Sequence, residues 1–132
     1  MVAMSDAKSV VEAAVFRALA EAVSTATVYQ DAPDNAPLPI VVIGDMRSAR
    51  LGGKAASPDR SVTVAIVTLI EAQERAPLLA LMDEIEGALD GVTFEADGWT
   101  LSGSFDDDEA VLADDGSTYS GLSSFTFLAL AD

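Results

Sequence analysis

The sequence predicts an α+β fold in which two helices pack on a largely antiparallel β-sheet. Two segments, around 6–24 and 76–90, carry apolar residues at helical spacing, whereas the other apolar segments alternate or run continuously as strands do. The predicted order is one helix, three strands, a second helix and further strands. With 132 residues, half of them hydrophobic, the chain is long enough for one domain, 1–132, with its own core.

The first helix is predicted to begin after Ser5 or Asp6, either of which can cap it, and to end near Ser24. Its apolar residues recur at helical spacing, and most of its charged residues fall elsewhere. Those apolar residues are Val11, Val15, Ala18, Leu19, Ala22 and Val23. A short strand within 25–30 and a turn rich in Pro and Asp at 31–38 are predicted to follow.

Two strongly apolar segments, 39–44 and 61–70, are predicted to form the strands of a hairpin. Pro39 opens the first strand, where a missing backbone N–H group costs least. In the second strand apolar side chains occupy both faces, so we expect both faces to be covered by protein. The segment between them, 45–60, is rich in Gly, Ser and charged residues, which predicts a mobile hairpin tip.

The second helix is predicted to carry Pro77 in its first turn and to end at Gly91, a suitable C-terminal cap. The remaining strands are predicted at 92–95, 99–105 and 118–131, with an acidic turn over 106–115. In the last of these strands, Phe125 and Phe127 fall on one face because side chains alternate along a strand. Trp99 is predicted to anchor the core or an interface.

Charge is distributed very unevenly along the chain. The net charge is −15, yet four of the seven basic residues lie in the predicted hairpin tip: Arg47, Arg50, Lys54 and Arg60. From 76 to 132 there are thirteen acids and no Lys or Arg. Opposite charges favour docking, so these four residues are candidate subunit-binding or partner-binding residues, with another copy of the chain as the obvious partner. The alternative is that they are solvated loop charge.

Several function classes are disfavoured by composition. The chain has no Cys and no His, which removes thiol nucleophiles, thiolate metal sites and most catalytic triads. We see no secretory signal, and no apolar run approaches the ~20 residues of a membrane span. The excess of acid disfavours binding to phosphate backbones. We therefore expect no enzymatic activity, no cofactor and no membrane partner.

Three local patterns resemble functional sites without matching one. The acidic segment 106–115 could offer oxygens to a cation, but its spacing is not that of an EF-hand loop, and a solvated turn is favoured. Gly52, Gly53 and Lys54 lack the rest of a phosphate-binding loop. The carboxylates of 83–86 have no nucleophile nearby in the predicted helix. We expect no metal site and no catalytic residues.

The segments TVYQD at 27–31 and APLPIVVIG at 36–44, which follow the first helix, resemble the tail-completion or tail-terminator proteins of phages with long, non-contractile tails. Gene transfer agents carry related proteins. The family has an opening helix, a short strand, a turn with Pro and a Pro-led apolar strand that ends in Gly. A long hairpin, a second helix and closing strands follow, so the resemblance covers nearly the whole chain.

The resemblance implies a structural virion protein that assembles in the host cytoplasm as a ring, usually a hexamer. Such a ring caps the head-proximal end of the tail tube, stops its polymerisation and forms the joint to the head-completion protein. Its implied partners are copies of itself, the major tail tube protein and the head-completion protein, while DNA passes through the lumen without specific binding. The alternative from another class is a small accessory module with a binding pocket between sheet and helices.

Overall fold

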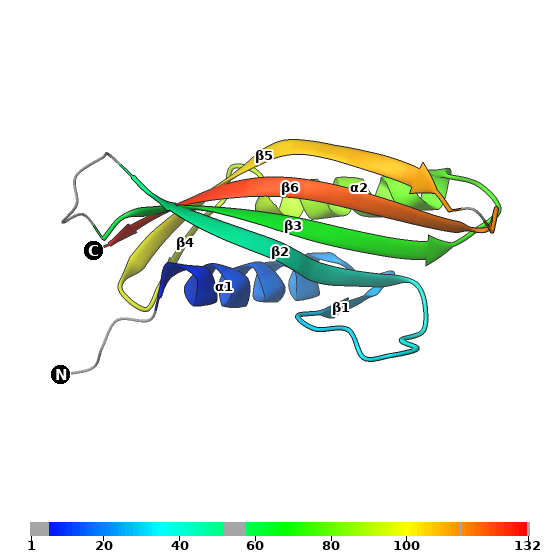
Figure 1. Ribbon diagram of the computed structural model, residues 1–132, viewed down its shortest axis with the longest axis horizontal. Helices are drawn as coiled ribbons and strands as arrows, with labels where there is room; N and C mark the ends of the chain where they lie inside the picture. Colours follow the sequence, from blue (N-terminus) through cyan, green and yellow to red (C-terminus); the bar gives the residue numbers. More distant parts are fainter. Residues whose placement is uncertain (1–5, 52–57, 114, 132) are drawn as a thin grey trace.

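The computed structural model describes residues 6–51, 58–113 and 115–131. Its elements, in order, are α1 (Ala7–Ala22), β1 (Thr27–Tyr29), β2 (Ile40–Arg50), β3 (Arg60–Glu71), α2 (Ala76–Leu89), β4 (Thr93–Ala96), β5 (Trp99–Leu112) and β6 (Thr118–Ala131). All six strands belong to one sheet in the order β1-β2-β3-β6-β5-β4. Figure 1 shows this sheet as a long, twisted and curled layer, with both helices behind it.

The sheet is mixed, although most of it is antiparallel as predicted. The neighbours β2–β3, β3–β6, β6–β5 and β5–β4 are antiparallel, but β1 runs parallel to β2. The connection 30–39 loops back beside β1 before β2 begins, which makes the two strands run in the same direction (Figure 1). The order of strands along the chain was predicted, but their directions depend on the path of this loop.

Both helices begin and end where local chemistry predicts. Asp6 caps α1, because its carboxylate Oδ1 accepts a hydrogen bond from the backbone N–H of Ser9 at 2.9 Å. Pro77 lies in the first turn of α2, where its missing N–H is tolerated. Gly91 follows the helix with a φ of 73°, a left-handed conformation that suits glycine at a helix end.

The core lies between the two helices and one face of the sheet. The inward side chains of the central strands are fully buried, among them Val62, Val64, Ile66, Phe125 and Phe127. Trp99, at the start of β5, is only 4 % exposed and belongs to this core. The opposite face of β3 carries side chains that are only half-buried, Ala65, Val67 and Leu69. Within one chain, the expectation that both faces of this strand are covered is therefore wrong.

Two strands extend farther than the sequence predicted. Residues 45–50 belong to β2 and pair with β3, and residues 106–112 belong to β5 and pair with β6. The predicted mobile tip at 45–60 is therefore wrong for 45–50, and the predicted acidic turn is confined to the link between β5 and β6. The remaining tip, 52–57, lies outside the described residues. Ladder hydrogen bonds to long partner strands hold these polar segments extended.

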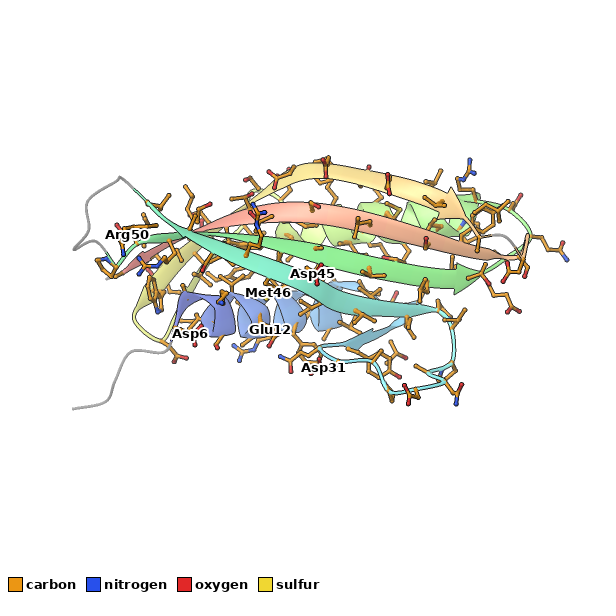
Figure 2. The ribbon with its side chains drawn as sticks, in the orientation of Figure 1. Asp6, Glu12, Asp31, Asp45, Met46 and Arg50 are labelled. Carbon is orange, nitrogen blue, oxygen red and sulfur yellow. The ribbon has the colours of Figure 1, made fainter. Side chains whose placement is uncertain are left out.

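Each of these strands contains a β-bulge where its polar part begins. The register shifts between Ile43 and Met46 in β2, and between Phe105 and Asp107 in β5. A bulge adds one residue to one strand and locally increases its twist. Figure 2 shows Asp45 and Met46 midway along β2, at the shift, and Arg50 at the far end of the strand.

Two glycines give a matched test of this packing. A Cβ atom at Gly103 would lie 2.5 Å from the carbonyl oxygen of Leu89 and 2.6 Å from Cε2 of Phe127, whereas one at Gly87 would meet nothing within 4 Å. Gly103→Ala should therefore lower the free energy of unfolding by about 1–3 kcal/mol, as overpacking does. Gly87→Ala, in the interior of α2, should raise it by about 0.5–1 kcal/mol.

Denaturant unfolding of the two variants and the parent chain measures both changes. Equal stability of the two variants would show that β5 does not approach the end of α2 as closely as described.

Candidate functional site

One edge of the sheet is basic. The outer strand β1 pairs with β2 only from Ile40 to Val42. Beyond Val42, no described strand lies outside β2, so the segment 43–50 is an open sheet edge. Its exposed side chains include Arg47 and Arg50, together with one acid, Asp45. We call residues 43–50 the basic edge.

The structure gathers three of the four predicted partner-binding residues at the end of the β2–β3 hairpin. Arg47 lies opposite Thr63, and Arg50 lies directly opposite Arg60. Lys54 lies outside the described residues. Two like charges directly opposite each other raise the positive potential at this end of the hairpin.

The hairpin is tied to the rest of the sheet through Asp59. The carboxylate Oδ1 of Asp59 accepts a hydrogen bond from the backbone N–H of Ala131 at 2.9 Å, at the end of β6. The guanidinium Nη1 of Arg60 donates to the carbonyl oxygen of Asp59, also at 2.9 Å. Arg50 and Arg60, at the end of the hairpin, are thus held on paired strands, which fixes the direction in which they are presented.

The opposite edge of the sheet is acidic. The outer strand β4 pairs with β5 only from Trp99 to Ser102. Just beyond, the outward groups of Gly103 and Phe105 are bonded to the link after α2, where the carboxylate of Asp90 accepts from the N–H of Phe105 at 2.9 Å. From 106 to 112 no described strand lies outside β5. We call residues 106–112 the acidic edge; its four acids, Asp106, Asp107, Asp108 and Glu109, are all exposed.

The sequence did not reveal this second edge as a strand. A run of four acids predicts a turn, because charged runs are usually solvated and contribute nothing to a hydrophobic alternation. The only local signal was the run Ala110, Val111 and Leu112 immediately after the acids, which is typical of a strand. Pairing with β6, residue by residue from Asp107 to Leu112, keeps the segment extended.

The described acids between 106 and 115 do not converge on a common point. Asp106 accepts a hydrogen bond from the hydroxyl of Thr126 at 2.6 Å, and Asp115 is used in the turn between β5 and β6. Asp115 accepts from the backbone N–H groups of Ser117 and Thr118, each at 2.8 Å. Among the described residues, no three acids are placed to hold a metal ion. The carboxylates of 83–86 belong to no such cluster either.

One surface groove is lined by residues of neither edge. It has a volume of about 920 Å³ and runs between α1 and β4. Small apolar side chains such as Ala13, Ala14 and Ala18 line it together with Phe94, and its charged lining residues include Arg17 and Glu21. It is therefore an open surface groove beside the core, rather than the enclosed pocket between sheet and helices that an accessory binding module would need.

Comparison with known proteins decides the family. Residues 12–129 match the family model of the tail completion protein gp17. The chain belongs to this tail completion family. No curated protein sequence matches it. Among solved structures, a chain of the "Virion of native gene transfer agent (GTA) particle" has the same fold, with a TM-score of 0.78 at 20 % sequence identity. The alignment covers 92 % of this chain and 96 % of that one.

Family membership makes this tail completion protein a structural component of a phage-like tail, located in the virion. The predicted resemblance to tail-completion proteins is confirmed. None of the described helices is long and apolar enough to cross a membrane. The two charged edges are then features of a tail protein, which must contact other protein subunits.

The turn at Asp115 predicts a dependence of stability on pH. Hydrogen bonds from the backbone N–H of Ser117 and then from Thr118 hold the pKa of Asp115 below its ordinary value of 3.8. A lowered pKa in the folded chain means that the stabilisation is present above about 3.8 and is lost as the pH falls through the lower folded pKa. Asp115→Ala should therefore destabilise the protein at neutral pH, and its difference from the parent chain should disappear in acid.

Urea unfolding at a series of pH values measures this difference. Asp83→Ala, which removes an exposed carboxylate from α2, controls for the change in net charge. A difference that persists unchanged below the folded pKa would contradict the described turn.

Proposed function

We propose that this tail completion protein closes into a hexameric ring at the head-proximal end of a tail tube. There it stops polymerisation of the tube and forms the joint to the head-completion protein. The proposal is carried by the family match over 12–129. The partners are further copies of the chain, the major tail tube protein and the head-completion protein.

The two edges support assembly into a ring. A ring needs a heterologous interface, in which two different patches of one subunit meet the same patches on its neighbours, and the rotation must close. The basic edge and the acidic edge are two such patches, at the two opposite lateral edges of one sheet. Arg47, Arg50, Lys54 and Arg60 are the residues we propose for subunit contact, since opposite charges favour docking and fix its register.

The charge of the chain suits a channel for DNA. Six copies of a chain with a net charge of −15 form a strongly negative ring, and carboxylates repel phosphates. DNA would pass through the lumen without being held by it. In this role the protein needs no catalytic residues, no cofactor and no specific contact with a base.

Deletion of the gene tests the proposed function directly. Particles assembled without the protein should have tails of uncontrolled length and tails that are not joined to heads, because nothing stops the tube or completes the joint. Electron microscopy of the particles measures both defects, and expression of the intact chain from a second locus should restore normal tails.

Tails of normal length joined to heads in the deletion would overturn the proposal. An accessory module would give that outcome, since it has no role at the end of the tube.

A further inference from the structure

We propose that successive subunits join by edge-to-edge strand pairing, with the basic edge of one copy adding antiparallel to the acidic edge of the next. The sheets of all subunits then form one continuous sheet around the ring. This inference rests on the proposed ring and specifies its contact. The occupant of each edge is a second copy of the same chain.

Strand directions allow this pairing without any change of fold. β2 is antiparallel to β3, β3 to β6, and β6 to β5, so β2 and β5 run in opposite directions within one sheet. A rotation about a ring axis carries the β5 of one copy to the outside of the β2 of its neighbour and preserves both directions. The two edges therefore meet antiparallel, and open backbone N–H and C=O groups on each edge gain partners.

The charges favour this contact over the other possible ones. Pairing of two basic edges would set Arg47 and Arg50 against the same residues of another copy, and pairing of two acidic edges would juxtapose eight carboxylates. Like-charge contacts of this kind suppress the wrong partner. Only the contact between a basic and an acidic edge is attractive, and that contact is heterologous, as a ring requires.

Charges and bulges also protect sheet edges against uncontrolled pairing, and both edges have them. Protection of that kind works by repulsion between copies. Here the two edges of one molecule carry opposite signs, so copies of the chain attract each other edge to edge. The pattern prevents pairing of identical edges and permits pairing of different ones.

One register satisfies both the charges and the faces of the sheet. Arg47 pairs with Thr63, and Glu109 pairs with Leu122, on the face of the sheet away from the helices. With Arg47 opposite Glu109 of the neighbour, antiparallel counting sets Ala49 opposite Asp107, on the same face, and Asp45 opposite Val111. In this register Arg47 faces a carboxylate on the same face of the sheet, and the single acid of the basic edge faces none.

The short outer strands set the offset between subunits. β1 covers one end of β2, and β4 covers the opposite end of β5, as Figure 1 shows. The open parts of the two edges therefore lie at opposite ends of the sheet, and neighbours can meet only with a shift along the strands. A shift of this kind is what a closed sheet of tilted strands needs.

Charge reversal with rescue tests the contact. The variant Arg47→Glu/Arg50→Glu makes both edges acidic, and Asp107→Lys/Glu109→Lys replaces the two acids that lie opposite Ala49 and Arg47 by bases, so neither variant should self-associate. An equal mixture should form rings in which the two variants alternate, because positions 47 and 109 then carry opposite charges at every contact. We expect self-association of each single species to weaken by about tenfold or more, and the mixture to recover it.

Matched controls change the net charge by the same amounts at residues that belong to neither edge. They are Lys8→Glu/Arg17→Glu on α1 and Asp83→Lys/Glu86→Lys on α2. Sedimentation at ~0.1 M salt, where screening reaches ~10 Å, measures association, and circular dichroism confirms folding. Failure of the mixture to recover association, or edge variants that assemble no worse than their controls, would overturn the edge contact.

Disulfide trapping tests the register. Because the chain has no native Cys, only the introduced thiols can form a disulfide. In the double variant Ala49→Cys/Asp107→Cys the two thiols of one chain are separated by β3 and β6, about 14 Å at the usual strand spacing, beyond the ~7 Å reach of a disulfide. Any bond therefore joins two copies. Assembled particles and the free protein at high concentration should show a ladder of covalent oligomers that ends in a closed ring.

The control pairs Ala49→Cys with Leu79→Cys, a position on α2 that is 50 % exposed and belongs to neither edge. If particles of Ala49→Cys/Asp107→Cys gave no more covalent oligomer than particles of the control variant, the register and the edge contact would be overturned. That result would leave the capping function standing, because the deletion phenotype tests it separately.

Discussion

Burial of one face of the sheet under both helices is the interaction on which the other features depend. Side chains alternate along β3 and β6, so one set, including Val64, Phe125 and Phe127, is removed from water against the helices. A shift of one residue in either strand would turn this set toward solvent, which fixes the register firmly. The long strands β2 and β5 lie on either side of this central pair, and their hydrogen bonds to β3 and β6 align them with it. The positions of their charged side chains follow from that alignment.

The two open edges arise because the outermost strands are short. β1 and β4 end after three and four residues, whereas β2 and β5 run for 11 and 14. The polar half of each long strand therefore extends past its cover. In a free monomer water satisfies these backbone groups, so the open edges do not prevent folding, but they remain templates for another strand.

Sequence reasoning found the elements that bury apolar residues and missed those that do not. The cap at Asp6, Pro77 in α2, Gly91 and the strand containing Phe125 and Phe127 all follow from local chemistry, and the structure confirms them. The segments 45–50 and 106–112 carry little apolar alternation, so nothing local indicates that they are extended. They are strands because β3 and β6 pair with them, and that pairing is non-local.

For the same reason, the sequence predicted which residues form the charged groups of the candidate site but not where the fold places them. Clustering of Arg47, Arg50, Lys54 and Arg60 is visible along the chain, as is the acidic carboxyl-terminal half. That the two groups lie on opposite edges of one sheet depends on the strand order β2-β3-β6-β5, which composition and periodicity do not determine. The prediction that the basic residues contact an acidic copy stays untested, but the structure gives it a specific geometry.

Net charge and local charge act in opposite directions in the proposed ring. Subunits with a charge of −15 repel each other at a distance, whereas the basic edge attracts the acidic edge only at close range. Free subunits must therefore overcome this long-range repulsion before they gain the contact, which keeps pairing of the open edges weak in dilute solution. At the end of a tail tube, contacts with the tube raise the effective concentration of neighbouring subunits. A ring held by edges of opposite sign would then close where the tube ends, and its charge would oppose assembly elsewhere.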